Sequence, residues 1–420
     1  MIKIDNVQTF NFESIPIESY WNSSNENELK IHQIHTYPAK FPAFVTTKAI
    51  NYAKENGLSL NTIADIFCGC GTTAFEAKRN NIDYWGCDIN PVATMIAKTK
   101  SKKYQISRVL RYYEAIISSY KEEEIHNEYD NAVERLKYWY SEKQYNDLFY
   151  LKSLIMENTP SNSDYRFFFL CAFSNILKSS SRWLTKSIKP QVDPNKEPVE
   201  VYALFKNQCN KMFKAIEKLP LFGQSKNKII TGNFLDNAHN FSRTDMIITS
   251  PPYVISYEYA DLHQLSSLWL GYANDYRELR EGTIGSLHHI YNFDKEKTKL
   301  NITGNGVIHQ LLNNENDKAR SVAKYFLDMQ KVIKKTYSIL NKKGMAFFII
   351  GNTEYKGVKI DNVRHLAESM FDAEYSEVSV SKRKISQKIL TPYRDKKGKF
   401  TSNANERKVY NEEFIICGKK

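Results

Sequence analysis

Short apolar runs alternate with helix-like segments in two parts of this 420-residue chain. In the first part, the runs TIADIF (62–67) and DYWGCDIN (83–90) each precede a segment with helical periodicity. In the second part, the runs NKIITGNF (227–234), DMIITS (245–250) and GMAFFIIGN (344–352) follow one another. Alternation of strand and helix over so short a span predicts parallel strands in a doubly wound α/β sheet.

The remaining segments carry other patterns. Residues 104–230 show helical periodicity and few strand signals, and residues 1–31 predict an irregular arm. The polar, Gly/Asn-rich stretch 277–318 predicts a long surface loop. The tail carries two apparent strands, at 374–381 and 409–417, which a basic loop joins.

One apolar run ends abruptly in Ser250-Pro251-Pro252-Tyr253. Each proline lacks an N–H group and has a fixed φ, so the ladder of a sheet cannot continue through them. The strand therefore ends in a stiff post that carries Ser250 and Tyr253 at its carboxyl edge, which is where ligands bind in open α/β sheets. Taken alone, the motif also fits an ordinary strand-ending turn.

A glycine-containing turn, CGCGTT (68–73), lies between an apolar run and a helical segment. Gly69 and Gly71 would let the backbone pass close to a ligand, although a plain tight turn has the same pattern. Asp88 comes 17 residues after Gly71, at the end of the next run. A carboxylate there can accept both hydroxyls of a ribose, or it can cap the helix that begins at Pro91.

Position 74 is Ala, so the third glycine of the dinucleotide fingerprint is absent. A nucleoside cofactor without a pyrophosphate fits this turn better, and S-adenosylmethionine is the obvious candidate. Asn233 or Asp236, after the third run, could meet an adenine edge or belong to an ordinary loop.

The net charge of +12, from 59 Lys and Arg against 47 Asp and Glu, suits a polyanionic partner such as nucleic acid, although many unrelated proteins are basic. No run approaches the roughly 18 apolar residues of a membrane span. The first residues lack a signal-peptide pattern, so we expect a cytoplasmic protein without a membrane partner. The six cysteines form no CxxC pair, and no metal site is expected.

Two basic stretches, KSSSRWLTKSIKPQ (178–191) and SKRKISQKILTPYRDKKGK (381–399), are candidates for phosphate contact or for a solvated basic face. The candidate DNA-contacting residues are Lys178, Arg182, Lys186, Lys189, Lys382, Arg383, Lys384 and Lys388.

Four motifs in order, DIFCGCGTT, GCDIN, TGNF and TSPPY, preceded by HTYPAKFPAFV (35–45), resemble the DNA amino-methyltransferases. These enzymes methylate cytosine N4 or adenine N6 and are typical of bacterial restriction–modification systems. The resemblance implies a Rossmann-like methyltransferase sheet of seven strands with a C-terminal antiparallel hairpin, plus a helical insert that faces it across a DNA cleft. Double-stranded DNA is the implied substrate, and a cognate restriction endonuclease is a possible partner. The implied division is an arm and cofactor-binding half (1–103), a helical insert as candidate target-recognition domain (104–230) and a catalytic half (231–420).

The same resemblance assigns roles to single residues. Ser250 Oγ and the Pro251 carbonyl would draw the target amine towards sp3 geometry, and Tyr253 would stack on a base flipped out of the duplex. The residues implied at the cofactor are Lys40, Phe41, Asp65, Phe67, Gly69, Gly71 and Thr72, together with Asp88 and Asn233.

Serine at position 250 favours cytosine N4 over adenine N6, and both stay open. An RNA or tRNA amine methyltransferase is a rival, which an RNA-binding module would favour. A nucleic-acid-binding protein with a relic fold is the non-enzyme rival, and the intact glycine turn and Ser-Pro-Pro-Tyr post weigh against it.

Overall fold

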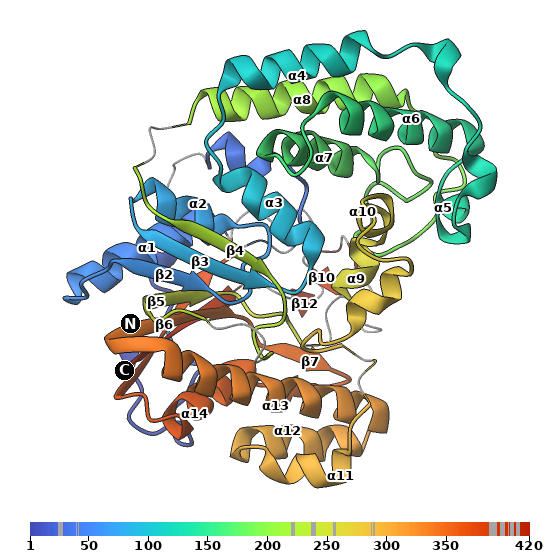
Figure 1. Ribbon diagram of the computed structural model, residues 1–420. Coiled ribbons are helices and arrows are strands. Elements are labelled where there is room, and N and C mark those ends of the chain that lie inside the picture. The colour runs from blue at the N-terminus through green and yellow to red at the C-terminus, as the bar shows by residue number, and fades with distance from the viewer. Residues whose placement is uncertain are drawn as a thin grey trace.

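An eight-stranded sheet with helices on both faces forms the centre of the molecule (Figure 1). This computed structural model describes residues 1–23, 28–38, 40, 42–219, 223–236, 241–254, 258–286, 288, 290–385, 393–394, 400–401, 403, 407–408 and 412–420. In spatial order the strands are β1 (Ile2–Lys3), β9 (Glu377–Lys384), β13 (Glu412–Lys419), β6 (Leu340–Ile350), β5 (Thr244–Thr249), β2 (Thr62–Asp65), β3 (Asp83–Asp88) and β4 (Asn227–Thr231).

The five strands from β6 to β4 pair in parallel, whereas β13 is antiparallel to both of its neighbours, β6 and β9. The predicted α/β methyltransferase sheet with a C-terminal antiparallel hairpin is confirmed. The expected count of seven strands is one short, because β1 pairs with β9 through Ile2 and Val380 at the sheet edge. The arm therefore contributes a strand that its mixed, polar sequence does not signal.

Alternate residues of the central strands bury into two different hydrophobic clusters. On β5, Met246 and Ile248 join one cluster, and Ile247 joins the other. The first cluster is covered by α1 (Ala43–Glu55) and α2 (Thr72–Arg79), and the second by α13 (Asn316–Ile339) and α14 (Asn362–Asp372). Burial on both faces explains why these strands read as continuous apolar runs in the sequence.

The stretch predicted as a long surface loop, 277–318, contains a buried helix, and that prediction is wrong. It includes η5 (Tyr276–Arg280), α11 (Phe293–Glu296), η6 (Lys297–Lys299) and α12 (Ile302–Leu312). Asn301 caps α12 by accepting a hydrogen bond from Gly304 N at 2.8 Å, and Glu368 of α14 accepts from Ile302 N at 2.8 Å. Two glycines masked the apolar spacing of Val307, Ile308 and Leu311, which are buried in the same cluster as α13.

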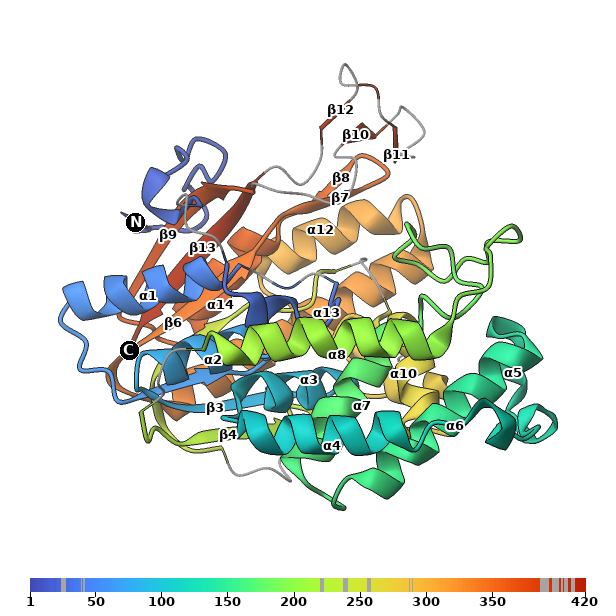
Figure 2. The ribbon, with the colours of Figure 1, turned by 90° about the horizontal axis from the view of Figure 1, so that it is seen from above.

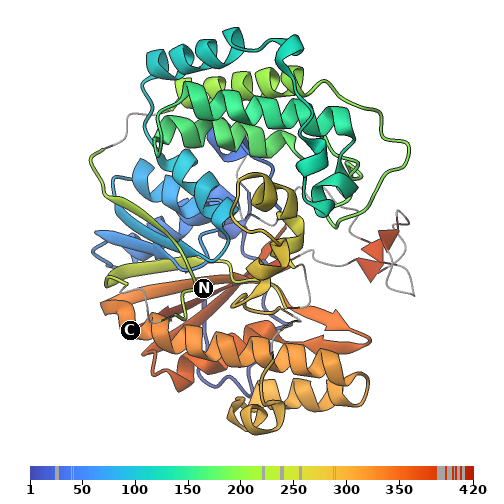
Figure 3. The same cartoon turned by 45° about the vertical axis from the view of Figure 1, so that its right-hand side comes forward.

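Helices of the 104–230 segment lie directly on the sheet's own helical layer (Figures 2 and 3). One hydrophobic cluster joins Phe75 of α2 and Met95 of α3 (Pro91–Ser101) to Phe169 of α7. Here the segment packs against α2 and α3, so the expectation that a cleft separates it from the sheet is wrong at this contact. The domain boundaries stay a prediction. The elements of the segment are α4 (Ile106–Ser118), η3 (Glu122–Glu124), η4 (Tyr129–Asn131), α5 (Glu134–Trp139), α6 (Glu142–Asn158), α7 (Asp164–Ile176) and α8 (Val201–Glu217).

Two short helices, α9 (Tyr259–Leu262) and α10 (Gln264–Trp269), follow the Ser-Pro-Pro-Tyr post and reach the helical segment, where Trp269 is buried. The smaller elements are η1 (Ser19–Trp21), η2 (Lys30–Gln33), β7 (Thr353–Tyr355), β8 (Val358–Ile360), β10 (Tyr393–Arg394), β11 (Phe400–Thr401) and β12 (Arg407–Lys408). Every helix in the described part of the chain is too short or too polar to cross a bilayer.

Candidate cofactor and catalytic site

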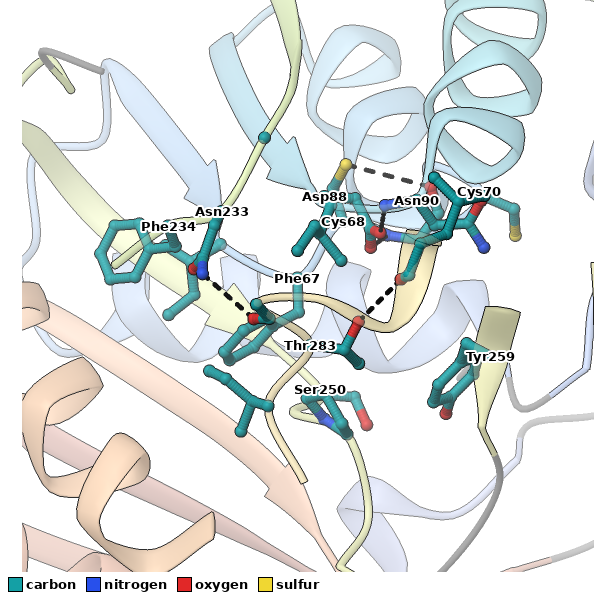
Figure 4. A pocket seen from close by; sticks show the side chains of 18 of the residues that line it. Phe67, Cys68, Cys70, Asp88, Asn90, Asn233, Phe234, Ser250, Tyr259 and Thr283 are labelled. Carbon is teal, nitrogen blue, oxygen red and sulfur yellow. Dashed lines mark hydrogen bonds between the residues drawn. The ribbon is translucent and has the colours of Figure 1, made fainter. Parts of the chain in front are cut away.

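A pocket opens at the carboxyl ends of the parallel strands, and both chemical motifs reach it (Figure 4). It holds about 990 Å³ of empty space, including solvent at its mouth. The lining residues are Tyr37, Lys40, Ile66, Phe67, Cys68, Gly69, Cys70, Thr72, Asp88, Ile89, Asn90, Gly232, Asn233, Phe234, Ser250, Pro252, Tyr259, Ala260, Leu279, Gly282, Thr283 and Ile284.

The two glycines of the turn have different surroundings. Gly69 (φ +46°) lines the pocket, and a Cβ there would lie 3.5 Å from the Tyr37 ring. Gly71 (φ +76°) does not line it, because its α-carbon faces α3, where a Cβ would lie 2.6 Å from the Ala97 Cβ. The structure therefore gives Gly71 a packing role between α2 and α3, which corrects its predicted place beside the cofactor.

Asp88 lines the pocket at the end of β3 and is fixed by the backbone. Its Oδ2 accepts a hydrogen bond from Gly69 N at 2.8 Å, and its Oδ1 accepts from Asn90 N at 2.9 Å. Burial raises the pKa of Asp88 to about 6, against the lowering effect of these two hydrogen bonds. Asn90 caps α3 by accepting a hydrogen bond from Val92 N at 3.0 Å. The capping role considered for Asp88 therefore belongs to Asn90.

Asp65 lies behind the pocket wall and connects the two motifs. Its Oδ1 accepts hydrogen bonds from Thr249 Oγ1 at 2.7 Å and from Phe67 N at 3.2 Å. Burial raises the pKa of Asp65 to about 7, against the effect of the Thr249 hydroxyl. Asp65 is absent from the lining, so it holds the turn against β5 and does not face a ligand. Thr249 is the residue before Ser250, and sequence reasoning missed it.

Other predicted cofactor residues are placed as follows. Phe67, Thr72 and Lys40 line the pocket. The Lys40 ammonium donates to Glu28 Oε2 at 2.8 Å and to the His32 carbonyl at 2.7 Å. Phe41 lies outside the described residues.

Asn233 lines the pocket, but its amide is engaged by the protein. Its Nδ2 donates to the Gly282 carbonyl at 3.1 Å, and its Oδ1 accepts from Leu235 N at 2.9 Å (Figure 4). One Nδ2 hydrogen and one Oδ1 lone pair remain, so contact between Asn233 and an adenine edge stays a prediction. Asn233 also fastens the segment 279–284 across the pocket, where Gly282 (φ +72°) approaches so closely that a Cβ would lie 3.1 Å from Asn233 Nδ2.

Sequence reasoning missed an entire wall of the pocket. Leu279, Gly282, Thr283 and Ile284 come from a stretch interpreted as surface loop. Tyr37, from the stretch HTYPAKFPAFV (35–45), and Tyr259 also line the pocket, and neither was assigned a role from the sequence. In the sequence, the one hint of a close backbone approach is the glycine at position 282, and a glycine in a polar stretch is too common to identify a site.

The Ser-Pro-Pro-Tyr post emerges from β5 as expected for a strand end. Ser250 and Pro252 line the pocket, and Pro251 is buried. The half-buried Tyr253 donates its hydroxyl to Glu413 Oε2 at 3.3 Å, and Glu413 Oε1 accepts from Arg383 Nε at 2.6 Å. Burial, followed by the Glu413 charge, raises the pKa of Tyr253 well above its usual value. The Tyr253 ring is therefore anchored to the C-terminal hairpin.

The two basic stretches differ in exposure. Arg182, Lys186 and Lys189 are exposed, whereas the half-buried Lys178 ammonium donates to the Ser187 carbonyl at 2.8 Å inside its own loop. Lys384 is exposed, and Lys388 lies outside the described residues.

Lys382 and Arg383 are buried, and the prediction that they contact phosphate is wrong. Lys382 Nζ lies 3.3 Å from the Glu412 carboxylate and donates to the Glu13 carbonyl at 3.1 Å, so the arm covers it. Arg383 is only 2% exposed and is paired with Glu413. Among the described residues, no group of three or more His, Cys, Asp or Glu side chains is placed to hold a metal ion.

The strand order and the pocket at the strand ends define an α/β methyltransferase fold. Residues 5–99 match the family model of the DNA methylases. The type II methyltransferase M.MvaI of Kocuria varians is 22% identical over 375 residues, which cover 80% of each chain. The type II methyltransferase M.BsoBI of Geobacillus stearothermophilus is 25% identical and covers 67% of this chain and 60% of its own. M.MjaII of Methanocaldococcus jannaschii is 26% identical over 34% of this chain and 26% of its own.

Together, the family model and these relatives support a DNA amino-methyltransferase family for this chain. Among solved structures, the rRNA methyltransferase aviRa from Streptomyces viridochromogenes covers 92% of this chain and 88% of its own. Its TM-score is 0.27 at 9% identity, which is too low to assign a fold or a function.

Proposed function

We propose that this protein transfers a methyl group from S-adenosylmethionine to the exocyclic amine of a base in double-stranded DNA, with cytosine N4 favoured over adenine N6. The observation that carries the proposal is the meeting of Ser250 and Asp88 in one pocket. A carboxylate that can bind a ribose and a strand-end hydroxyl that can bind an amine thus line the same pocket. Adenine N6 and an RNA amine are the alternatives, and the type II relatives favour DNA.

The lining suits a nucleoside cofactor without phosphates. Each oxygen of Asp88 accepts one backbone hydrogen bond, which leaves lone pairs for two ribose hydroxyls. Phe67, Ile89 and Phe234 offer apolar surface for an adenine ring. Among the lining residues that the structure describes, Lys40 is the only Lys or Arg, and it is already paired with Glu28. A pyrophosphate would therefore find no free cation in this lining.

The post suits activation of a weakly nucleophilic amine. The lone pair of an exocyclic amine is conjugated with the ring, and acceptors for its protons favour the sp3 geometry that frees the lone pair. We assign this role to Ser250 Oγ and the Pro251 carbonyl. Both lie beyond Thr249, the last residue of β5. The bound cofactor supplies an electrophilic methyl group. The amine nitrogen would bond to the methyl carbon as the bond between that carbon and the sulfonium sulfur breaks, which leaves S-adenosylhomocysteine, and the nitrogen would then release one proton to solvent, so no protein nucleophile is required.

Tyr253 is assigned to the flipped base. Its hydroxyl is tied to Glu413, which is itself paired with Arg383, so the ring is oriented before the base arrives. A fixed ring loses little conformational freedom on stacking, and stacking contributes about 1–3 kcal/mol per base.

The exposed side chains of Arg182, Lys186 and Lys189 are assigned to DNA phosphates. The loop that carries them reaches the start of α13. Burial lowers the pKa of Lys318 there, and the positive charge of Lys189 also lowers it. A cognate restriction endonuclease is a further proposed partner, by analogy with the type II relatives.

The test is to incubate the purified protein with S-adenosylmethionine and duplex DNA and then to map and identify the modified base. We expect N4-methylcytosine at a defined sequence. The variant Ser250→Ala should bind the cofactor with unchanged affinity and methylate more than tenfold more slowly, because the lost contact strengthens only as the nitrogen rehybridises. N6-methyladenine would select the alternative base, methylation of RNA alone would select the RNA alternative, and cofactor binding without any methylated nucleic acid would contradict the proposal.

A further inference from the structure

A second groove lies on the surface and is lined by residues of α5, of α10 and of the chain that follows α10. Its lining residues are Val133, Glu134, Arg135, Tyr138, Leu268, Asn274, Asp275, Tyr276 and Arg277. None of them belongs to the pocket described above. The mixture of aromatic and guanidinium groups distinguishes this groove from an apolar docking face.

Aromatic rings surround the Arg135 side chain on three sides. Its guanidinium carbon lies 5.1 Å from the centroid of the Tyr138 ring, 5.3 Å from that of Tyr276 and 5.4 Å from that of Trp139. Its Nε donates to Gln264 Oε1 at 2.6 Å, and the same oxygen accepts from Trp139 Nε1 at 2.9 Å. Cation–π contacts and this hydrogen bond together fix the plane of the guanidinium.

Arg135 differs from the other arginines around it in lacking a carboxylate partner. Arg277 is paired with Asp275, and Arg280 is paired with Asp261 at 2.7 Å. Among the residues that the structure describes, Arg135 forms no ion pair, and its terminal amino groups make no hydrogen bond. Tyr138 is 52% exposed, so the cage opens to solvent. An oriented guanidinium with free N–H groups is suited to bidentate binding of a phosphate.

The Arg135 cage is built onto the wall of the cofactor pocket. Gln264 Nε2 donates to the Asp261 carbonyl at 2.7 Å, and Asp261 immediately follows Tyr259 and Ala260, which line that pocket. Helix α5 also adjoins the basic loop, because Arg182 N donates to the Trp139 carbonyl at 2.8 Å. The cage therefore lies between the site of chemistry and the exposed cations Arg182 and Lys186.

We propose that Arg135 is a preorganised binding site for a backbone phosphate of the substrate DNA. This inference rests on the proposed function and extends it, because it names a contact outside both basic stretches. An extended polyanion is favoured over a small phosphate compound, since the groove is open and continues towards further cations. The geometry fits positioning of the duplex through its backbone, with no reading of sequence.

The experiment measures binding of a fluorescently labelled 30-base-pair duplex of mixed sequence as a function of salt, in the presence of S-adenosylhomocysteine. For Arg135→Gln we expect the slope of log K against log[salt] to become less negative by about 0.9, the contribution of one phosphate. The matched control is Arg277→Gln, which removes an arginine of the same groove that already has a carboxylate partner. Its slope should equal that of the wild type. Arg135→Lys should keep the slope and bind DNA several-fold more weakly, because an ammonium lacks the planar fork.

A wild-type slope in Arg135→Gln together with a lowered melting temperature would overturn the inference and leave Arg135 as a fastener between α5 and α10. Should Arg135→Gln fail to fold, wild-type DNA affinity in Arg135→Lys would overturn it equally. Absence of salt-dependent DNA binding by the wild type would remove both the inference and the DNA substrate. Salt-dependent binding without methyl transfer would contradict the proposed function alone, and the slope of Arg135→Gln would still decide the role of Arg135.

Discussion

Replacement of Gly71 by alanine tests how the glycine turn is held. A Cβ at this position would lie 2.6 Å from the Ala97 Cβ and 2.8 Å from the Ala97 Cα. Carbon atoms in contact prefer about 3.5–4.0 Å, so α2 and α3 would have to separate by about 1 Å. Part of the obstacle is the backbone of α3, which cannot rotate aside as a flexible side chain could.

Two costs add in Gly71→Ala. The left-handed backbone, φ +76°, costs a side chain about 1–2 kcal/mol, and overpacking adds about 1–3 kcal/mol. We therefore expect Gly71→Ala to lower the free energy of unfolding by about 2–5 kcal/mol. Gly57→Ala is the matched control, because Gly57 has φ +80° and no atom within 4 Å of its ideal Cβ. Its cost should be the strain alone, about 1–2 kcal/mol.

Urea unfolding of the two variants measures the difference, and a titration with S-adenosylmethionine shows whether the cofactor site moves. Gly71 is the N-cap of α2, next to the lining residue Thr72, so displacement of the helix should also weaken cofactor binding. The double variant Gly71→Ala/Ala97→Gly removes the opposing methyl group. It should recover only part of the overpacking cost and part of the affinity, because the α-carbon of residue 97, 2.8 Å from the new Cβ, stays in place. The glycine inside α3 itself costs about 1 kcal/mol.

Equal unfolding free energies for Gly71→Ala and Gly57→Ala would refute the packing role. A loss of cofactor affinity that Ala97→Gly does not restore even in part would also refute the packing role. It would mean that the new methyl group contacts the cofactor directly.

Four further predictions concern Tyr253, Asp88 and the basic loop. Tyr253→Phe should keep most single-turnover methylation, since it retains the ring and loses only the hydroxyl bond to Glu413. Tyr253→Ala should lose about 5- to 150-fold in turnover per folded molecule. Wild-type turnover in a folded Tyr253→Ala would exclude stacking. Cofactor affinity should rise with pH through about 6 and then level off, because the Asp88 carboxylate accepts hydrogen bonds from both ribose hydroxyls only when it is ionised. Calorimetric titration of Asp88→Asn should show no such rise. Folding raises the pKa of Asp88 from 3.8 to about 6. The contribution of Asp88 to the unfolding free energy should therefore fall as the pH rises from about 4 to about 6. Charge reversal at Lys186 and Lys189 together should flatten the salt slope of DNA binding by about 2, and an unchanged slope would place the phosphates elsewhere.

The sequence by itself determined the framework of the site. Apolar runs that end in glycine or proline identify strands and their carboxyl edges, because propensity and chain-breaking act locally. Gly69, Asp88 and Ser250 consequently meet at one edge, since parallel strands bring their carboxyl ends together.

Only the tertiary structure decided which charged residues stay in water. Lys382 and Arg383 belong to the most basic stretch of the chain, yet β9 lies between β1 and β13, and carboxylates of β13 pair with both side chains. The Asn233 amide is likewise engaged by Gly282, 49 positions away. Burial and pairing depend on contacts between residues far apart in the chain, and local periodicity carries no information about them. For the same reason Arg135, an ordinary helix residue in the sequence, acquires its oriented guanidinium only where α5, α10 and Tyr276 come together.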